Sequence, residues 1–312
     1  MRWATCAAPR TTTRFLGMLP GPSAAKGRQA VLTPLGIVPG RATLRNVVDK
    51  GGLPVYDCGQ SRQRERAHLE GSQPLASVII PAYNEERRMP ASLRRVVDLI
   101  QQQSDPIEVI VVDDGSRDAT AAIVEEFVRD IPFVTLIRNP HGGKGAAIKT
   151  GIAKGRGQYL ILSDTDLSVP IEELRKFLPP VLTNYDVAIA SREVKGARRI
   201  NEPAYRHLMG RVYNLLVRLV AVPGIQDTQC GFKAFRREVA REVFPLQTIE
   251  GWGFDVEILF IARRRGYRIL EVPVDWYYGE ESKIRPIRDT LRMVRELFQV
   301  RQNAWKGLYD RR

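Results

Sequence analysis

Asp164 and Asp166 stand one residue apart, directly after the short apolar run at residues 159–162. A run of this length and composition is typical of a buried strand. In open α/β sheets, ligands bind in the crevice outside the carboxyl ends of the strands. Two carboxylates on the chain leaving a strand can turn toward one divalent cation, which proteins often hold through one or two carboxylates and substrate phosphates. The alternative is a solvated acidic loop, but the strand ends that precede this pair favour a metal site.

Three earlier apolar runs read as strands, at residues 77–80, 107–112 and 134–137. Each is followed by a stretch with helical character, near residues 92–101, 118–129 and 144–154. Strand and helix alternating in this way predict right-handed βαβ units. We therefore expect an α/β fold with a mostly parallel sheet and helices on both of its faces.

The turns after these strands carry groups suited to a nucleotide diphosphosugar. Tyr83 and Glu85, after the first strand, offer a ring and a carboxylate for a base and its edge. Asp114, after the second strand, can accept a hydrogen bond from a ribose hydroxyl or a base N–H. Gly143 and Lys144, after the third strand, bring exposed backbone N–H groups and a cation to the start of a helix, where anions bind well.

Other classes of site are excluded by spacing. The glycine turn lacks the G-x-x-x-x-G-K-[ST] pattern of a P-loop NTPase, and no G-x-G-x-x-G opens a helix after the first strand, as a dinucleotide dehydrogenase requires. Cys6, Cys58 and Cys230 show no C-x-x-C spacing, so neither a zinc site nor a disulfide framework is expected, and a reducing compartment is favoured. Cys230 is expected to be a packed thiol, and His141 is the one histidine in a candidate site turn.

Residues from about 77 to 308 resemble the family 2 glycosyltransferases of the Rossmann-like GT-A fold. Within that family they resemble most the branch that contains the dolichyl-phosphate β-glucosyltransferases and the polyprenyl-phosphate glycosyltransferases. The motifs that carry the resemblance are residues 78–85 (VIIPAYNE), 111–116 (VVDDGS), 143–145 (GKG), 164–166 (DTD), 226–233 (QDTQCGFK) and 252–257 (WGFDVE). The first four are shared by many family 2 enzymes, and the last two are narrower.

The resemblance implies an inverting hexosyltransferase that moves a sugar from a nucleotide diphosphate donor to the phosphate of a polyprenol. It implies that Asp164 and Asp166 hold Mg²⁺ or Mn²⁺ on the donor diphosphate. It also implies these contacts to the donor: Pro81, Ala82, Tyr83, Glu85, Asp114, Gly143, Lys144, Thr165 and Lys283. Because a lipid phosphate is already anionic at neutral pH, the reaction needs no strong general base, and positioning and electrostatic stabilisation supply most of the acceleration.

The second half of the chain supplies the acceptor side in this resemblance. Arg192 and Arg206 correspond to positions that bind the acceptor phosphate, and Arg192 is also a catalytic candidate. The planar guanidinium suits this role because it grips phosphate oxygens through two bonds. Asp227 and Gln229 are expected to line the sugar pocket. The alternative for Arg206 is a solvated helix face.

Asp255 is the last catalytic candidate, on a helix expected at residues 252–263. Asp255 and Glu257 are two residues apart, so on a helix they point about 200° apart and at most one of them faces the site. With a phosphate acceptor, Asp255 is expected to orient the acceptor or a sugar hydroxyl. The alternative is an acid that only favours the helix dipole.

Several functions stay open at this point. Trp276 resembles the glucosyl branch more than the mannosyl branch, which favours UDP-glucose over GDP-mannose as the donor. A family 2 enzyme with a soluble phosphorylated acceptor is a second alternative. A catalytically inactive nucleotide-binding regulator is a third, although such a relative is expected to lose the acid pair, Arg192 and Lys283.

The charge of the chain is basic and uneven. The 312 residues carry a formal net charge of +13, and residues 1–73 alone hold 11 Lys or Arg against 4 Asp or Glu. A basic surface suits phosphorylated substrates and an anionic membrane. Nucleic acid is not an expected partner, because no helix-turn-helix, RRM or zinc signature is present and the strand ends are acidic.

Residues 1–73 are expected to be a basic extension with little fixed structure, and residues 74–312 a single catalytic domain. No apolar segment is long enough to span a bilayer. Residues 208–222 and 286–305 combine arginines with apolar positions, a pattern typical of interfacial helices. Those apolar positions are Leu215, Leu216, Leu219 and Val220 in the first, and Ile287, Leu291, Val294, Phe298 and Trp305 in the second. We therefore expect a cytoplasmic protein that attaches peripherally to the cytoplasmic face of a membrane.

Overall fold

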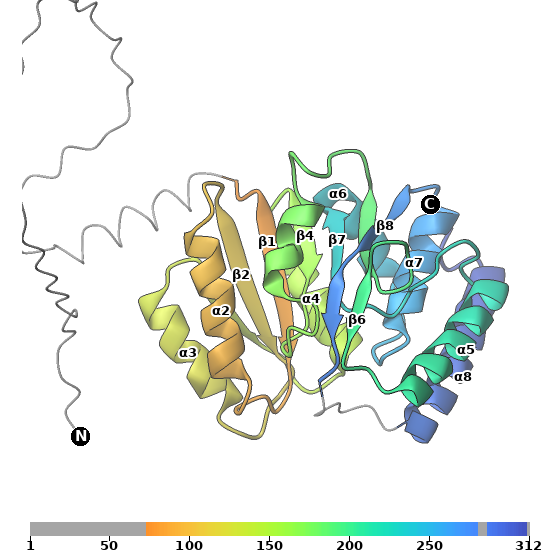
Figure 1. The fold of residues 1–312 in the computed structure, drawn as a ribbon, viewed down its shortest axis with the longest axis horizontal. Coiled ribbons are helices and arrows are strands. Elements are labelled where there is room, and N and C mark those ends of the chain that lie inside the picture. Colours follow the sequence, from red (N-terminus) through yellow and green to blue (C-terminus); the bar gives the residue numbers. More distant parts are fainter. Residues whose placement is uncertain (1–72, 280–285, 311–312) are drawn as a thin grey trace, which may run out of the picture. The chain divides into compact units, whose positions relative to one another are not determined.

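A seven-stranded sheet forms the centre of the protein in the computed structural model, which describes residues 73–279 and 286–310. The strands lie in the order β3-β2-β1-β4-β7-β5-β8 (Figure 1). Their bounds are Ala76–Ala82 (β1), Ile107–Asp113 (β2), Val134–Arg138 (β3), Tyr159–Leu162 (β4), Val187–Ser191 (β5), Lys233–Arg236 (β7) and Ile269–Pro273 (β8). Neighbouring strands are parallel, except that β7 is antiparallel to β4 and β5. The expected mostly parallel sheet is confirmed.

Helices cover both faces of the sheet, because side chains alternate between the two faces along each buried strand. Val78 and Ile80 pack on the face covered by α2 (Met89–Gln101), α3 (Thr120–Asp130) and the 3₁₀ helix η1 (Ile171–Phe177). Ile79, between them, packs on the opposite face. That face is covered by α4 (Lys144–Lys154), α5 (Ala204–Val220), α6 (Arg237–Val243), α7 (Phe254–Arg264) and α8 (Pro286–Trp305). The expected arrangement of helices on both faces is also confirmed.

Strand β7 is absent from the sequence-based prediction, since it has only four residues and a basic residue at each end. Its direction matters for the site. Lys233, its first residue, lies opposite Leu162 of β4 and Ile189 of β5. The reversed strand therefore starts close to the edge of the sheet where the parallel strands end.

A second sheet of two short strands lies beside the first. Strand β6 (Arg198–Ile200) pairs in parallel with β9 (Asp275–Tyr277), which sets Arg199 opposite Trp276. This pairing joins segments more than seventy residues apart, so nothing local in the sequence predicts it.

Helices α5 and α8 lie side by side at one end of the protein (Figure 1). Leu297, Val300 and Ala304 of α8 are buried in the core. Among the helices of the described residues, none is long and apolar enough to cross a bilayer. Residues 1–72 and Lys283 lie outside the described residues, so the boundary between an extension and a domain, and the role of Lys283, stay predictions.

Candidate active site

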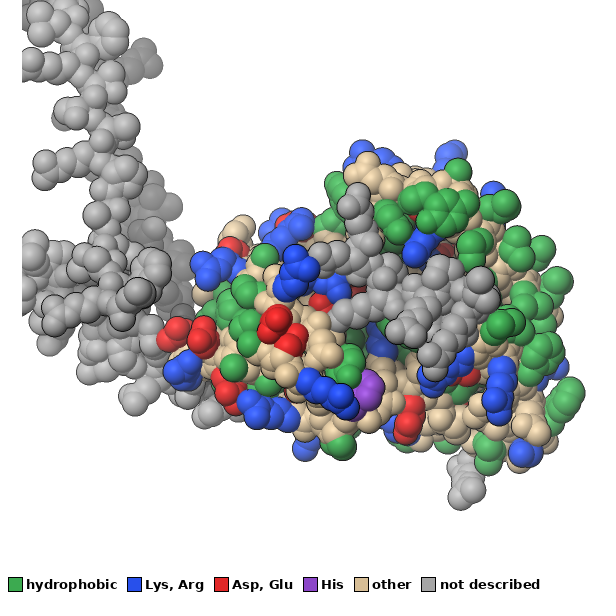
Figure 2. All heavy atoms as spheres, turned by 90° about the horizontal axis from the view of Figure 1, so that it is seen from below, with side chains coloured by type: hydrophobic (Ala, Val, Ile, Leu, Met, Phe, Trp, Pro, Cys, Tyr) green, Lys and Arg blue, Asp and Glu red, His purple; other side chains and the backbone are tan. Residues whose placement is uncertain are grey.

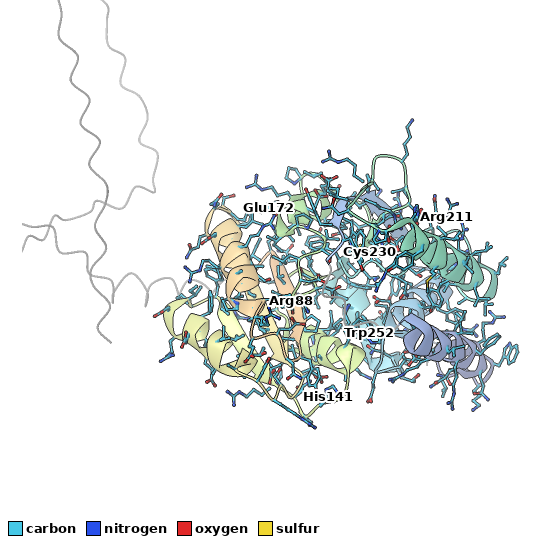
Figure 3. The ribbon with its side chains drawn as sticks, turned by 60° about the horizontal axis from the view of Figure 1, so that its bottom comes forward. Arg88, His141, Glu172, Arg211, Cys230 and Trp252 are labelled. Carbon is cyan, nitrogen blue, oxygen red and sulfur yellow. The ribbon has the colours of Figure 1, made fainter. Side chains whose placement is uncertain are left out.

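A cavity of about 720 Å³ opens at the carboxyl edge of the parallel strands. Its lining includes these predicted site residues: Pro81, Ala82, Tyr83, Glu85, Asp114, Gly143, Lys144, Asp164, Thr165, Asp166, Arg192, Arg206, Gln229 and Asp255. Figure 3 labels Arg88, His141, Trp252 and Cys230, which line the same cavity from different elements. The structure thus brings together strand ends that are far apart in the sequence, as the parallel topology predicts.

Asp164 and Asp166 face this cavity because the residue between them is anchored elsewhere. The Thr165 hydroxyl, which is buried, donates to the Pro81 carbonyl at 2.8 Å. Asp164 Oδ1 lies 2.7 Å from Lys144 Nζ, and Asp166 Oδ1 accepts from the Ser168 N–H at 2.9 Å. Partial removal from water and the nearby Asp164 carboxylate both raise the pKa of Asp166. A bound cation would relieve this repulsion.

Gly231 makes room for the acid pair. A Cβ atom added at Gly231 would lie 2.0 Å from Asp164 Oδ2, closer than any atom can approach. The glycine of the 226–233 motif is therefore required by the position of Asp164. Within the described residues, no group of three or more His, Cys, Asp or Glu side chains is placed to hold a metal. A metal at this pair would take its other ligands from a substrate, as Mg²⁺ commonly does.

The glycine turn differs from its prediction. The Asp114 carboxylate accepts from the N–H groups of Gly142 and Gly143, at 2.9 and 2.8 Å. The Gly145 N–H donates to the Glu250 carbonyl at 2.7 Å. The N–H groups of Gly142, Gly143 and Gly145 therefore bind within the protein, which corrects the expectation that they are exposed to an anion. Asp114 still lines the cavity, and its contact with the donor stays a prediction. Asp114 shapes the turn, and the Lys144 ammonium is the cationic group that the turn presents.

An aromatic pair and an ion pair form the wall at the end of β1. The Tyr83 ring stacks on His141 with centroids 4.1 Å apart and planes inclined by 19°. Glu85 holds Arg88 through two hydrogen bonds of 2.7 and 2.9 Å. The predicted ring and carboxylate are thus both at the cavity, and His141 and Arg88 are added to them.

Asp227 does not line the cavity, which corrects one prediction. Its carboxylate is fully buried and accepts from Arg192 Nε and an Arg192 terminal nitrogen, at 2.7 and 2.9 Å. Burial alone raises the pKa of Asp227, but the Arg192 guanidinium lowers it to about 2. Asp227 therefore stays ionised and fixes the orientation of Arg192, whose own side chain does line the cavity.

The acceptor side carries more cations than the sequence analysis names. Arg199 lines the cavity and is held by Glu193 and Glu202, each at 2.6 Å. The Arg192 and Arg199 guanidinium groups lie 5.1 and 5.9 Å from the Trp276 ring. Arg206 lies 5.4 Å from the Tyr278 ring. Arginine and aromatic side chains therefore alternate along this wall. Arg199 reaches the wall through the long-range pairing of β6 with β9, so no local sequence motif predicts its position.

Asp255 faces the cavity and Glu257 does not, as the helical spacing predicts. Glu257 accepts from the Ile249 N–H at 2.8 Å and from the Tyr309 hydroxyl at 2.6 Å, inside the core. Asp255 lies 2.5 Å from Lys233 Nζ. Helix α7 begins at Phe254, two residues later than predicted.

Lys233, like Arg199, belongs to the site although its role cannot be predicted from the sequence motifs. It is fully buried, and it donates to the Cys230 carbonyl at 2.6 Å as well as to Asp255. The sequence shows that Lys233 ends the 226–233 motif. It does not show that Lys233 pairs with Asp255, because the two residues are 22 positions apart. The Cys230 thiol is buried as expected, and burial raises its pKa to about 11.

The loop before α7 is tied to the C-terminal helix. The Gly253 N–H, at the N-terminal end of α7, donates to Glu296 Oε2 at 2.9 Å. Arg292 binds the other oxygen of Glu296 at 2.9 Å. Trp252, which precedes Gly253, lines the cavity with its ring 5.2 Å from Lys144 Nζ. Helix α8 therefore helps to place Trp252 and Asp255.

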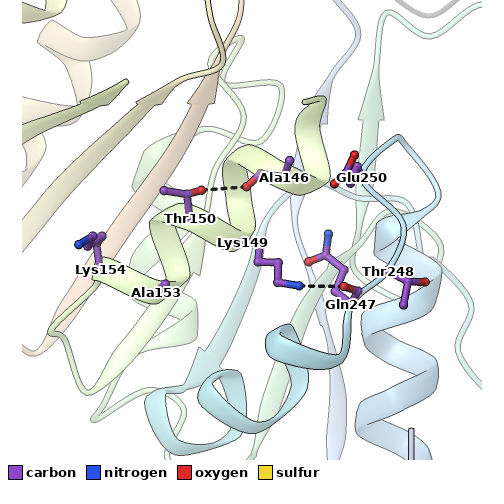
Figure 4. Close-up of a pocket in the computed structure, with 8 residues that line it drawn as sticks. All are labelled: Ala146, Lys149, Thr150, Ala153, Lys154, Gln247, Thr248 and Glu250. Atoms are coloured by element: carbon purple, nitrogen blue, oxygen red, sulfur yellow. Dashed lines mark hydrogen bonds between the residues drawn. The ribbon is translucent and has the colours of Figure 1, made fainter. Parts of the chain in front are cut away.

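A second hollow, of about 480 Å³, lies between α4 and the segment around the 3₁₀ helix η2 (Phe244–Leu246), as Figure 4 shows. Lys149 of α4 crosses it and donates to the Gln247 carbonyl at 2.9 Å. None of the predicted site residues lines this hollow. The contact of Lys149 with Gln247 links α4 to the loop that leads to α7.

Comparison with known proteins places the chain in a family. The family model described as "Glycosyl transferase family 2" matches residues 77–244. A dolichyl-phosphate beta-glucosyltransferase of Trichomonas vaginalis is 35% identical over 250 residues, covering 76% of this chain and 74% of that protein. The human dolichyl-phosphate beta-glucosyltransferase is also 35% identical over 250 residues, covering 75% of this chain and 76% of its own length.

Solved structures share the fold at lower identity. Glucosyl-3-phosphoglycerate synthase from Mycobacterium tuberculosis, crystallised with Mn²⁺ and UDP-glucose, aligns with a TM-score of 0.51 and 19% identity over 80% of this chain and 84% of that one. Mannosyl-3-phosphoglycerate synthase from Rubrobacter xylanophilus aligns with a TM-score of 0.54 and 16% identity over 84% and 82%. These likenesses show the fold alone, which is the GT-A fold. Given the family match and relatives 35% identical over about three quarters of its length, this chain belongs to glycosyltransferase family 2 and is a hexosyltransferase.

Proposed function

We propose that the protein transfers glucose, with inversion, from UDP-glucose to the phosphate of a dolichol or another polyprenol. The carrying observation is a single cavity in which the Asp164–Asp166 pair and Lys144 face a wall of arginine and aromatic side chains. One end suits a diphosphate with its metal, and the other suits a monophosphate. The names of the relatives in the comparison support the branch, the acceptor and the sugar.

Asp164 and Asp166 would hold Mg²⁺ or Mn²⁺ on the donor diphosphate. Two neighbouring carboxylates, of which Asp164 raises the pKa of Asp166, fit such an ion in the space left by Gly231. The ion supplies a Lewis acid that stabilises the charge of the leaving group. The protein's own part is to bind and orient the two phosphorylated substrates, which accounts for much of the rate enhancement in such reactions.

The donor would lie along the ends of β1 and β2, with Pro81, Ala82, Tyr83, Glu85, Asp114, Gly143, Lys144 and Thr165 around it. The stack of Tyr83 on His141 offers an aromatic face to a base at this end. Lys144 is the group closest to the acid pair, so we assign it to the diphosphate.

Arg192 and Arg206 would bind the acceptor phosphate. Arg192 is pre-oriented by Asp227, so binding costs little of its conformational freedom. Gln229 would donate to a sugar hydroxyl: its amide nitrogen is buried at the cavity and has no hydrogen-bond partner within the described part of the chain. Asp255, held by Lys233, would orient the sugar or the acceptor.

A polyprenol requires contact with lipid, and the end of the protein formed by α5 and α8 suits it. Leu208, Val212, Leu215 and Leu219 of α5 are exposed, and hydrophobic side chains gather at this end (Figure 2). Met209 and Arg206 of the same helix line the cavity, so the apolar surface begins at the site. We propose peripheral attachment to the cytoplasmic face of a membrane through this surface.

Only some of the apolar residues predicted to face a membrane are exposed on α5 and α8. In α5, Leu216 and Val220 pack on the core, while Leu215 and Leu219 are exposed. In α8, Val294 packs on the core, whereas Leu291, Phe298 and Trp305 are exposed. The Ile287 side chain is not among those described. Each helix therefore buries one stripe and exposes a neighbouring one, because it packs on the domain with one side only.

The test is release of nucleoside diphosphate by purified protein with Mn²⁺ and either UDP-glucose or GDP-mannose, with and without polyprenyl phosphate. We expect release from UDP-glucose that requires the lipid and is lost in Asp166→Ala. Asp98→Ala, an exposed acid of α2 away from the cavity, is the matched control and should keep activity. Release only with a soluble phosphorylated acceptor, or preference for GDP-mannose, would replace the proposal by that alternative. Nucleotide binding without any turnover would favour a regulator.

A further inference from the structure

Lys144 contacts a carboxylate that the proposed function assigns to a metal ion. Its Nζ lies 2.7 Å from Asp164 Oδ1, and 15% of its side chain is exposed. The rings of Trp252 and Phe254 lie 5.2 and 5.9 Å from the same nitrogen. The ammonium is therefore held by the Asp164 carboxylate and by two aromatic rings, which attract cations.

Several carboxylates surround the Lys144 ammonium. Asp164 is in direct contact with it, and Asp166 and Asp255 line the same cavity. Lys144 is also the first residue of α4, and it lines the cavity into which a donor phosphate would bind. One ammonium thus sits between two possible anionic partners, the Asp164 carboxylate and any phosphate bound at this helix end.

We propose that Lys144 is the internal counter-ion of the Asp164–Asp166 pair, and that it exchanges Asp164 for the donor diphosphate when metal and nucleotide bind together. This inference rests on the proposed function. A divalent ion and an ammonium beside one carboxylate repel each other, so Asp164 cannot hold both without cost. A diphosphate removes the conflict, because it gives Lys144 another anion.

Two roles of Lys144 differ in their effect on metal binding. A lysine that only binds the donor phosphate leaves the affinity for the metal alone unchanged. A counter-ion lysine weakens the affinity for the metal alone, and the nucleotide then restores it. By linkage, the metal strengthens nucleotide binding by the same factor. The affinity for the metal alone is therefore the decisive measurement.

The experiment measures Mn²⁺ binding without nucleotide, from the EPR signal of free Mn²⁺, at neutral pH. We expect Lys144→Met to bind Mn²⁺ about tenfold tighter than the wild type, within the range typical of coupled sites. Lys144→Arg keeps the charge and should bind like the wild type. Lys149→Met is the matched control, because it removes one charge from the same helix at a side chain that bonds the Gln247 carbonyl instead. Calorimetry with UDP in the presence of Mn²⁺ should show weaker UDP binding by Lys144→Met.

The exchange is overturned if Lys144→Met binds Mn²⁺ no more tightly than the wild type does. The same conclusion follows if neither protein binds Mn²⁺ without nucleotide. An equal gain in Lys149→Met also overturns it, since the effect would then come from overall charge. If Lys144→Met has a lowered Tm, Lys144→Gln replaces it. Failure of the wild type to bind UDP with Mn²⁺ would overturn the proposed function together with this inference, whereas the first two results overturn the inference alone.

Discussion

At the scale of single residues, the site consists of charged groups that hold one another in place. Asp227 holds Arg192, Lys233 holds Asp255, and Lys144 holds Asp164. Burying a charge is costly, and removing one partner of a buried pair leaves the other uncompensated. Asp227 and Lys233 thus stand behind the cavity and each fixes the direction of a cavity side chain, whereas Lys144 and Asp164 both line the cavity.

We expect the free energy of unfolding to depend less on pH in Asp227→Asn than in the wild type. Arg192 lowers the pKa of the Asp227 carboxyl to about 2, although burial alone raises it. A carboxylate with a lowered pKa in the folded state adds stability that is complete above its unfolded pKa of about 3.9, and this stability is lost as the pH falls through the folded value. Between about pH 6 and pH 2.5, the wild type should lose about 2 kcal/mol more of its free energy of unfolding than the variant. Urea unfolding at both pH values measures this difference, and equal losses in the two proteins would contradict the assignment.

At the scale of elements, the sequence predicts the donor side better than the acceptor side. The donor side follows from successive strands whose ends meet at one edge, a rule that needs no long-range information. The acceptor side depends on β7, on the pairing of β6 with β9 and on α8. These contacts join distant segments, and β6, β7 and β9 are too short to show a periodicity. For this reason the sequence does not predict the roles of Lys233 and Arg199, or the position of Asp227 behind Arg192.

The contact between α8 and α7 makes a prediction at the same scale. A Cβ atom added at Gly253 would lie 2.4 Å from Glu296 Oε2 and 2.9 Å from Glu296 Cβ, so Glu296 must shift and its hydrogen bond to the Gly253 N–H is strained. We expect Gly253→Ala to lower the free energy of unfolding by about 1–3 kcal/mol, as overpacking does. The turnover number should fall as well, because Trp252 and Asp255 flank this residue.

Two further variants check this interpretation. Gly210→Ala adds a Cβ that meets nothing within 4 Å, and it is the control for stability. Glu296→Gln keeps an acceptor for the Gly253 N–H, so it should retain more activity than Glu296→Ala. Equal activity in Glu296→Gln and Glu296→Ala would show that the hydrogen bond does not position the site.

At the scale of the whole molecule, the proposed membrane surface and the cavity share one helix. Leu219 of α5 is 76% exposed and Trp305 of α8 is 80% exposed, at the end of the protein where these helices meet. Arg211 and Arg218 of α5 and Arg301 of α8 belong to the same helices. Apolar and basic side chains together favour an anionic bilayer over a neutral one.

We expect Leu219→Glu to weaken binding to vesicles that contain phosphatidylserine. The substitution places a negative charge on a surface that we propose contacts anionic lipid, so binding should fall about tenfold at low salt. The difference from the wild type should shrink at high salt, because salt screens the repulsion between the new carboxylate and the lipid. Val181→Glu is the matched control, because Val181 is 66% exposed but lies outside α5 and α8. Vesicle flotation measures the bound fraction, and an equal loss in both variants would mean that α5 has no special part in attachment.

Tyr309 gives the protein a constraint on its synthesis. Its hydroxyl reaches Glu257 in the core, and α8 just before it holds the start of α7 through Glu296. The ribosome delivers the donor half of the cavity first, yet the Trp252–Asp255 segment gains these contacts only when residues 296–309 have emerged. A nascent chain therefore cannot complete these contacts of the site until translation has passed Tyr309.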